Sequence, residues 1–298
     1  MGNAAWTFPG QGSQSVGMGT DAAERSPGAA RVFARVDEAL GFNLSEIILN
    51  GPAEELVKTS IQQPAILTAS IAHFSVLQEQ GVLPEPACVA GHSLGEYSAL
   101  VAAGSLSVED AARLVRRRGE LMEMHGLGGM VAVIGLDTSQ LVDIAEQSGV
   151  EVANFNAPGQ ITLSGRSESL EKAGELAKEA GARRVLPLPV NGAFHSSLMQ
   201  PVADALWPEI EAVEMKAPIA PMLANVDARP LSDPDELRAE LRDHITESVR
   251  WIDIIEQASS MGVDTFYEVG PGKVLSGLAP RIIKGCTTHH AEQLLSDS

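Results

Sequence analysis

The segment VAGHSLGEYSAL, residues 89–100, places Ser93 between two glycines. The short apolar run ACVA precedes the serine, and small residues that suit a helix follow it. A G-x-S-x-G pattern between a strand and a helix is typical of a nucleophile elbow, whose tight turn leaves the serine hydroxyl exposed. The helix N-terminus then offers unpaired N–H groups to a developing oxyanion. Ser93 is therefore a candidate nucleophile, with an ordinary turn between strand and helix as the alternative.

A serine nucleophile needs a base, and the chain has seven histidines. His195 lies in GAFHSSLM, in a loop loosened by Gly192, and loops often carry catalytic side chains. It is the candidate base, although spacing alone does not separate it from His244. The other five histidines have simpler explanations, as residues of a helix core, a helix end, a turn and a polar C-terminal tail: His73, His125, His92, His289 and His290.

Arg118 is expected on the apolar side of its helix. The residues three or four positions away from it are all apolar: Leu114, Val115, Leu121 and Met122. A buried arginine is costly unless it meets an anion. That anion is either an internal carboxylate or a carboxylate of the substrate, held by two parallel hydrogen bonds. The second alternative, together with a serine and a base, predicts transfer of an acyl group that bears a free carboxylate.

Short apolar segments alternate with helical patterns along most of the chain. Helical spacing marks residues 28–40, 64–80 and 110–124, and short strands run into the turns at FPGQG, residues 8–12, and at Ser93. This alternation favours an α/β fold with a parallel sheet.

Residues 127–190 have an order of elements of their own. Apolar patterns predict strands at 128–136, 150–156, 159–165 and 183–190, and helices at 139–149 and 167–181. The resulting β-α-β-β-α-β order is ferredoxin-like. We therefore expect a ferredoxin-like subdomain at 127–190, inserted into a larger α/β domain made of residues 1–126 and 191–298.

Composition narrows the possible functions. The 298 residues are 44% hydrophobic and 20% charged, which suits a soluble globular protein. A net charge of −18 argues against general nucleic-acid binding, which needs a basic face. No apolar run has the length of a membrane span, no signal-peptide pattern is present, and two cysteines form neither a disulfide framework nor a zinc-binding spacing. We expect a cytoplasmic protein without a metal ion or a nucleotide cofactor.

Several motifs together resemble one family, the malonyl-CoA:acyl carrier protein transacylases of bacterial fatty acid synthesis. The matching motifs follow one another from residue 5 to 285: FPGQGSQ (8–14), QPAILTAS (63–70), GHSLGEYSAL (91–100), RGELM (118–122), NFNAPGQ (154–160), GAFHSSLM (192–199) and YEVGPGKVL (267–275). Agreement along the whole chain is far more specific than any single motif. The family fold is a hydrolase-like α/β core with a ferredoxin-like subdomain, and the resemblance therefore implies the same arrangement here.

The resemblance implies a nucleophile and a base. Ser93 would carry the malonyl ester, and His195 would act first as general base and then as general acid. Family members lack an acidic third residue, and the backbone carbonyl of His244 would orient His195 instead. This chain has His244 and Ser248 where the family usually has glutamine and proline. The change is tolerated if the backbone oxygen alone matters.

The resemblance also assigns the residues that would surround the acyl group. The backbone N–H groups of Gln11 and Leu94 would form the oxyanion hole, and Arg118 would bind the malonyl carboxylate. Gln63 and Phe194 would contact the substrate. Leu94 and Phe194 fit the malonyl-selective pattern, because a bulky Phe194 would crowd a methyl group on the α-carbon.

The implied partners are malonyl-CoA and acyl carrier protein, with the enzyme acting as a monomer. Carrier proteins of this kind are acidic, as this chain is, so docking needs a local basic patch. The candidate residues for that patch are Arg183, Arg184, Lys273, Arg281 and Lys284.

Three alternatives remain open at this stage. One is a trans-acting acyltransferase of a polyketide synthase, and another is a non-catalytic subunit that binds a carrier protein. The third is a serine thioesterase or other hydrolase, which would want an acidic residue between Ser93 and His195 in chain order. No carboxylate stands out there.

Overall fold

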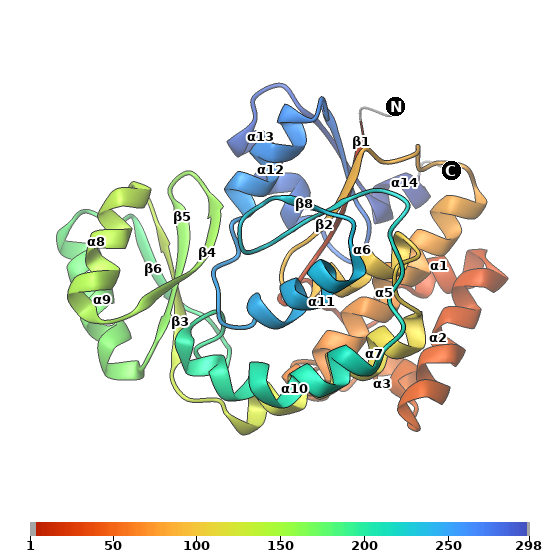
Figure 1. Ribbon diagram of the computed structural model, residues 1–298, viewed down its shortest axis with the longest axis horizontal. Coiled ribbons are helices and arrows are strands. Elements are labelled where there is room, and N and C mark those ends of the chain that lie inside the picture. Colours follow the sequence, from red (N-terminus) through yellow and green to blue (C-terminus); the bar gives the residue numbers. More distant parts are fainter. Residues whose placement is uncertain (1–3, 297–298) are drawn as a thin grey trace.

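The computed structural model describes residues 4–296, and its larger part is built on a six-stranded sheet in the order β10-β9-β1-β2-β7-β8 (Figure 1). The strands are β1 (Ala4–Phe8), β2 (Cys88–Gly91), β7 (Met222–Leu223), β8 (Pro230–Leu231), β9 (Thr265–Glu268) and β10 (Thr287–His290). All neighbouring strands are parallel except the β7–β8 pair. Strands β1 and β2 are buried along their whole length, as expected for a sheet covered on both faces. The predicted α/β core is confirmed, with an antiparallel edge that the sequence did not indicate.

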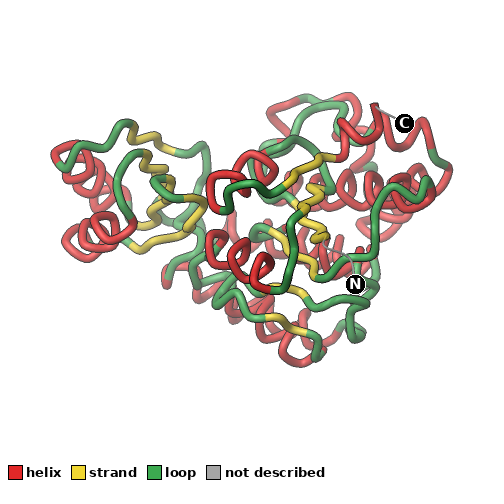
Figure 2. Tube along the Cα trace, turned by 90° about the horizontal axis from the view of Figure 1, so that it is seen from above, coloured by secondary structure: helices red, strands yellow, loops and turns green. Residues whose placement is uncertain are grey.

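Helices cover this sheet (Figures 1 and 2). They are α1 (Thr20–Arg25), α2 (Pro27–Leu40), α3 (Leu44–Asn50), α4 (Ala53–Leu56), α5 (Thr59–Glu79), α6 (Gly95–Ala102), α7 (Val108–Met124), α10 (Gln200–Ala212), α11 (Pro234–Asp243), α12 (Trp251–Ser260), α13 (Val274–Ile282), α14 (Ala291–Ser296) and the 3₁₀ helix η1 (Ser197–Met199). No helix of the described chain is long and apolar enough to cross a membrane.

A second sheet lies to one side of the large one, as Figures 1 and 2 both show. Its strands are β3 (Gly129–Ile134), β4 (Glu151–Ala157), β5 (Gln160–Gly165) and β6 (Arg184–Pro187), and its helices are α8 (Thr138–Ser148) and α9 (Ser167–Glu179). The strand order β4-β5-β3-β6 is antiparallel throughout. These strands and helices enclose an apolar core of their own. The predicted ferredoxin-like subdomain is confirmed in element order and topology, while the boundaries at 127 and 190 stay predictions.

Helix α5 begins earlier than the predicted 64–80. It starts at Thr59 and continues through Pro64, which removes one backbone hydrogen bond to the carbonyl of Ser60. That carbonyl accepts instead from Nη1 of Arg116, at 2.9 Å. The arginine thus compensates for the proline, and the helix places Gln63 inside the protein, where it is fully buried.

The predicted polar C-terminal tail is wrong. Residues 287–290 form β10, which pairs in parallel with β9, and α14 follows. The ring of His289 lies 5.1 Å from that of Tyr267, so this histidine packs against the sheet. The sequence TTHH has no apolar alternation, and pairing with β9 therefore decides its conformation. The predicted larger domain includes residues 1–3 and 297–298, and the search for a signal peptide included residues 1–3. All of these lie outside the described residues.

Candidate active site

Ser93 lies in the turn between β2 and α6, in the geometry of a nucleophile elbow. Its φ is 53°, a left-handed conformation that is strained for a residue with a side chain. Both flanking glycines are required. A Cβ on Gly91 would lie 1.9 Å from the carbonyl carbon of Gly95, and a Cβ on Gly95 would lie 2.2 Å from the backbone oxygen of Phe8. The crowding that excludes side chains on both sides holds the serine hydroxyl in place.

His195 faces Ser93 across the site. Its Nε2 lies 2.8 Å from Ser93 Oγ, and its Nδ1 lies 2.8 Å from the backbone oxygen of His244 and 3.1 Å from that of Glu247. Like Ser93, it has a positive φ, 56°. The fold therefore selects His195 over His244 as the histidine beside the serine.

The hydrogen bonds of His195 fix its protonation. A carbonyl oxygen only accepts, so Nδ1 carries the proton and the lone pair of Nε2 points at the hydroxyl of Ser93. Burial lowers the pKa of His195 well below its ordinary value, and the positive charge of Arg118 lowers it further. The ring is therefore neutral at neutral pH, which is the state that a general base requires.

The segment that supplies the two carbonyls is held by the subdomain. The N–H of Val249 donates to the oxygen of Ala153 at 2.8 Å, and the N–H of Phe155 donates to the oxygen of Val249 at 2.9 Å. Ser248 donates its hydroxyl to the backbone oxygen of Val152 at 2.5 Å, a bond that the usual proline would not make. The substitution at 248 is thus accommodated by an additional contact with β4.

Arg118 is buried, with 1% of its surface exposed, as its position in the apolar stripe of α7 predicts. Nη2 donates to Ser93 Oγ at 3.0 Å and Nη1 donates to Gln63 Oε1 at 2.9 Å. Its Nε has no acceptor in the described chain, and no carboxylate there forms an ion pair with it. The internal ion pair is therefore not the explanation for its burial, and the guanidinium keeps a free donor beside the serine.

A cavity of about 290 Å³ opens in front of these residues. Its lining includes Gln11, Ser93, Arg118, Phe194 and His195, with an apolar wall of Val57, Met122, Met130, Leu188, Pro189 and Val190. Gln63 and Leu94 lie behind the lining. A cavity that combines an apolar wall with a few charged and hydrogen-bonding side chains suits a substrate with a polar reacting end.

The loops of Gln11 and Leu94 leave the sheet side by side. Phe8 at the end of β1 pairs with Gly91 at the end of β2, so both loops emerge at the carboxyl edge of neighbouring parallel strands. Within residues 4–296, neither the N–H of Gln11 nor that of Leu94 donates to an acceptor. Two free backbone donors beside a serine hydroxyl are what an oxyanion needs.

Two polar residues of the site were missed from the sequence. Asn225, in the turn between β7 and β8, accepts from the N–H of Ser93 at 2.8 Å and donates to the oxygen of Gly91 at 2.7 Å. His92 was assigned to the turn, but it also lines the cavity and its Nε2 lies 2.8 Å from Oδ1 of Asn156. Neighbouring side chains on a strand point in opposite directions, which predicted that His92 points away from the site. This reasoning does not apply, because His92 already lies past the end of β2.

One group of side chains in the described chain has the composition of a metal site, namely Glu96, Glu240 and His244. Nδ1 of His244 and Oε2 of Glu96 are in direct hydrogen-bond contact. In the described chain this contact is a hydrogen bond, and the absence of a metal ion stays a prediction.

Comparison with known proteins agrees with this geometry. Residues 5–286 match the family model described as "Acyl transferase domain". The malonyl CoA-acyl carrier protein transacylase of Salmonella typhimurium is 46% identical over 294 residues, which cover 96% of this chain and 95% of that protein. The chain belongs to this acyltransferase family.

Solved structures place the enzyme in the same group. An acyl carrier protein S-malonyltransferase from Vibrio cholerae has a TM-score of 0.94 and 42% identity, covering 97% of this chain and 96% of its own. A malonyl-transacylase solved in complex with its type II polyketide synthase acyl-carrier protein has a TM-score of 0.94 and 39% identity, covering 99% of both chains. The predicted family is confirmed, and the enzyme is an acyltransferase.

Proposed function

We propose that this acyltransferase transfers a malonyl group from malonyl-CoA to the phosphopantetheine thiol of acyl carrier protein, through an ester on Ser93. The observation that carries the proposal is the double contact of Ser93 Oγ, with the neutral Nε2 of His195 on one side and the buried Arg118 on the other. The first contact activates the hydroxyl as a nucleophile. The second places a guanidinium beside the acyl group, where a free carboxylate would need it.

In the first half-reaction, His195 Nε2 takes the proton of Ser93 as Oγ bonds to the thioester carbon. The N–H groups of Gln11 and Leu94 stabilise the oxyanion. The C–S bond then breaks, and His195 returns the proton to the sulfur of coenzyme A. The carbonyls of His244 and Glu247 hold the ring and stabilise its charged form during the step.

The second half-reaction reverses these roles with a new thiol. His195 takes the proton of the phosphopantetheine thiol, whose sulfur attacks the malonyl ester, and the proton passes to the departing oxygen of Ser93. One oxyanion hole serves both halves, which gives ping-pong kinetics. Arg118 would bind the malonyl carboxylate in both halves, with Gln63 holding the guanidinium and Phe194 limiting the space at the α-carbon.

The acceptor and the cellular setting are part of the same proposal. All five basic candidates for carrier docking are exposed, although Arg281 is already hydrogen-bonded to Gln160 and to the oxygen of Pro158. The pathway that we propose is fatty acid synthesis. The similarity to a malonyl-transacylase bound to a polyketide carrier supports service to a polyketide synthase as the second candidate. That the protein is cytoplasmic and acts as a monomer stays a prediction.

A hydrolase is disfavoured by the same contacts. His195 is oriented by backbone carbonyls rather than by an acidic residue, and a simple esterase has no use for a buried arginine at its nucleophile.

The deciding experiment is intact mass spectrometry after brief incubation with malonyl-CoA. The wild type should gain about one malonyl group and lose it when holo-acyl carrier protein is added, and Ser93→Ala should gain none. Ser98→Ala is the matched control, because this buried hydroxyl on α6, the helix that follows Ser93, has no partner in the described chain. Release of free malonate without transfer to the carrier would establish a hydrolase instead. If the wild-type protein gained no malonyl group, the alternative of a non-catalytic subunit would be favoured.

A further inference from the structure

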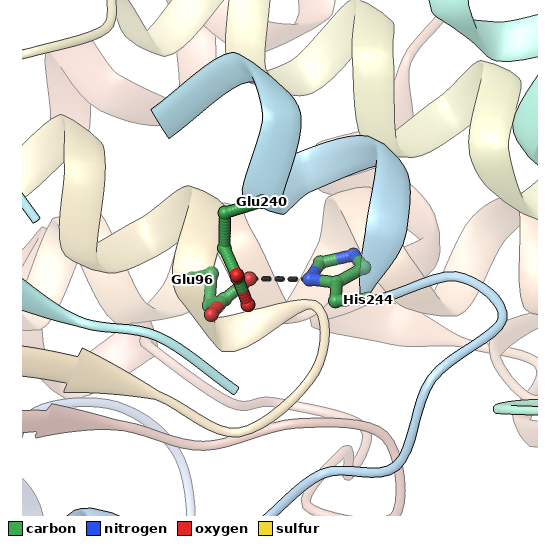
Figure 3. A group of neighbouring side chains, drawn as sticks. All are labelled: Glu96, Glu240 and His244. Carbon is green, nitrogen blue, oxygen red and sulfur yellow. Dashed lines mark hydrogen bonds and ion pairs between the residues drawn. The ribbon is translucent and has the colours of Figure 1, made fainter. Parts of the chain in front are cut away.

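Behind the reacting pair lies a second polar group, the Glu96–Glu240–His244 cluster (Figure 3). Glu96 lies on α6, one turn after Ser93. Glu240 lies on α11, and His244 follows four residues later at the end of that helix, so their side chains share one face. Figure 3 shows the ring of His244 pointing at the two carboxyl groups. All three side chains are buried, and the proposed reaction gives none of them a role.

One arm of the cluster reaches the nucleophile. Oε1 of Glu96 accepts from the N–H of Asn225 at 2.9 Å. The side chain of Asn225 in turn bridges the N–H of Ser93 and the oxygen of Gly91. Glu96 therefore fixes the one side chain that ties the strained turn of Ser93 to the strand before it.

The other arm reaches the base. The ring of His244 is held by its contact with Oε2 of Glu96, and the backbone oxygen of the same residue accepts from Nδ1 of His195 at 2.8 Å. Fixing the ring of His244 therefore also fixes the carbonyl that orients His195. Glu96 is the common point of both arms, since each of its oxygens serves one of them.

The two carboxyl groups keep their protons at neutral pH. Burial raises the pKa of Glu96 to about 8 and that of Glu240 to about 9, because a buried carboxylate loses its hydration. The N–H of Asn225 and the charge of Arg118 favour the ionised form of Glu96, so its pKa is the lower of the two. Glu240, whose Oε1 accepts from the N–H of Val226 at 3.1 Å, therefore keeps its proton to a higher pH than Glu96. The charged and titratable groups that face the cluster from its neighbours are Arg118, Tyr97, His195 and Asp243.

We infer that the Glu96–Glu240–His244 cluster is a positioning unit, which holds Ser93 and His195 in register through Asn225 and through the carbonyl of His244. The inference rests on the proposed function, because it concerns the acylation of Ser93. It gives His244 a side-chain role in addition to its backbone oxygen. It also explains why two carboxyl groups and an imidazole remain buried together, an arrangement that would otherwise only destabilise the fold.

The test is the rate constant of Ser93 acylation at saturating malonyl-CoA, measured by quenched-flow mass spectrometry in the wild type, His244→Leu and His244→Gln. The leucine keeps the backbone carbonyl but cannot form a hydrogen bond with Glu96. It should slow acylation roughly 10–100-fold, with the half-saturating malonyl-CoA concentration changed less than threefold, since no substrate contact is lost. Glutamine, whose amide both donates and accepts, restores a hydrogen bond with Glu96 and should recover most of that loss.

His73→Leu is the matched control. His73 is also buried and pairs with a carboxylate, Asp21, at 3.1 Å, but it lies ten residues along α5 from Gln63, roughly 15 Å by helix rise. This variant should lose stability and keep the acylation rate. Equal slowing of acylation in His73→Leu and His244→Leu would mean that the loss of any buried histidine slows the reaction, and it would overturn the inference. An unchanged acylation rate in His244→Leu would overturn it as well. In either case the malonyl ester on Ser93 would still form, so the proposed function would stand.

Glu240→Gln keeps the inference testable if His244→Leu does not fold. Glutamine has the shape of the protonated acid and stays uncharged at every pH. When Glu240 ionises in the wild type, two carboxylates repel each other and acylation should fall at alkaline pH. In Glu240→Gln that fall should move to higher pH, and an alkaline limb identical in both proteins would contradict the proton assignment.

Discussion

Replacing Arg118 by glutamine tests the carboxylate-binding role directly. The free Nε and the second hydrogen of Nη2 together offer two parallel donors, and Nη1 is held by Gln63. Hydrogen bonds to a charged group contribute about 1.5–3 kcal/mol each. Two such bonds in a site where Arg118 is only 1% exposed amount to about 3–6 kcal/mol. Malonyl loading should therefore lose roughly 10²–10⁴-fold in kcat/KM.

The assay compares malonyl-CoA with acetyl-CoA, which has the same thioester and no free carboxylate. Acetyl loading should hold or rise in Arg118→Gln, because an unpaired guanidinium no longer has to stay buried beside the methyl group. Arg118→Lys keeps the charge without the planar fork and should fall between wild type and glutamine for malonyl-CoA. An equal loss with both substrates would refute the reasoning, since it would mean that Arg118 acts on Ser93 and not on the carboxylate.

Three further outcomes follow from the same geometry. Arg118 lowers the pKa of His195. When the rate of Ser93 acetylation is plotted against pH, the fall on the acidic side should therefore lie at higher pH in Arg118→Gln than in the wild type, and identical profiles would exclude this coupling. The pKa of Glu240 is raised from 4.5 to about 9 in the folded wild type. Between pH 4.5 and about pH 9 the folded protein therefore holds a proton that the unfolded chain has released, so the free energy of unfolding falls as the pH rises through this range. Denaturant unfolding at pH 5, 7 and 9 should show Glu240→Gln gaining up to about 1.4 kcal/mol per pH unit over wild type, and a constant difference would contradict the raised pKa. Phe194→Ala should shift the preference of Ser93 loading toward methylmalonyl-CoA by about 1–3 kcal/mol, and an unchanged ratio of the two rates would place the selectivity elsewhere.

Local patterns in the sequence determined the elbow and the inward arginine. Ser93 lies between the strand ACVA and the small residues of α6, with a glycine on either side. This local pattern predicts the tight turn of a nucleophile elbow, and the left-handed φ of 53° at Ser93 agrees with it. The apolar positions around Arg118 likewise predicted its burial, because helical periodicity alone decides which face a residue occupies. The β-α-β-β-α-β order of the subdomain was visible for the same reason, since each element is periodic over a short stretch.

Contacts between distant segments were decided only by the tertiary structure. The choice of His195 over His244 depends on two loops that meet 102 residues apart in sequence, and no local pattern encodes that meeting. The short strands β7, β8 and β10 lack any alternation and exist because a neighbouring strand offers hydrogen bonds.

The polar groups behind the site could not be predicted from the sequence at all. Glu96 follows the elbow in a motif that suggests only a helix, and Glu240 is a charged residue between the apolar positions Leu237 and Leu241 of its helix. The structure buries both and brings them to His244, because α11 packs its end against α6. The sequence thus determined which residues could react, through periodicity and turn geometry. The fold alone decided which carbonyls, amides and carboxyl groups hold them in place, since those contacts join segments that lie from 49 to 148 residues apart.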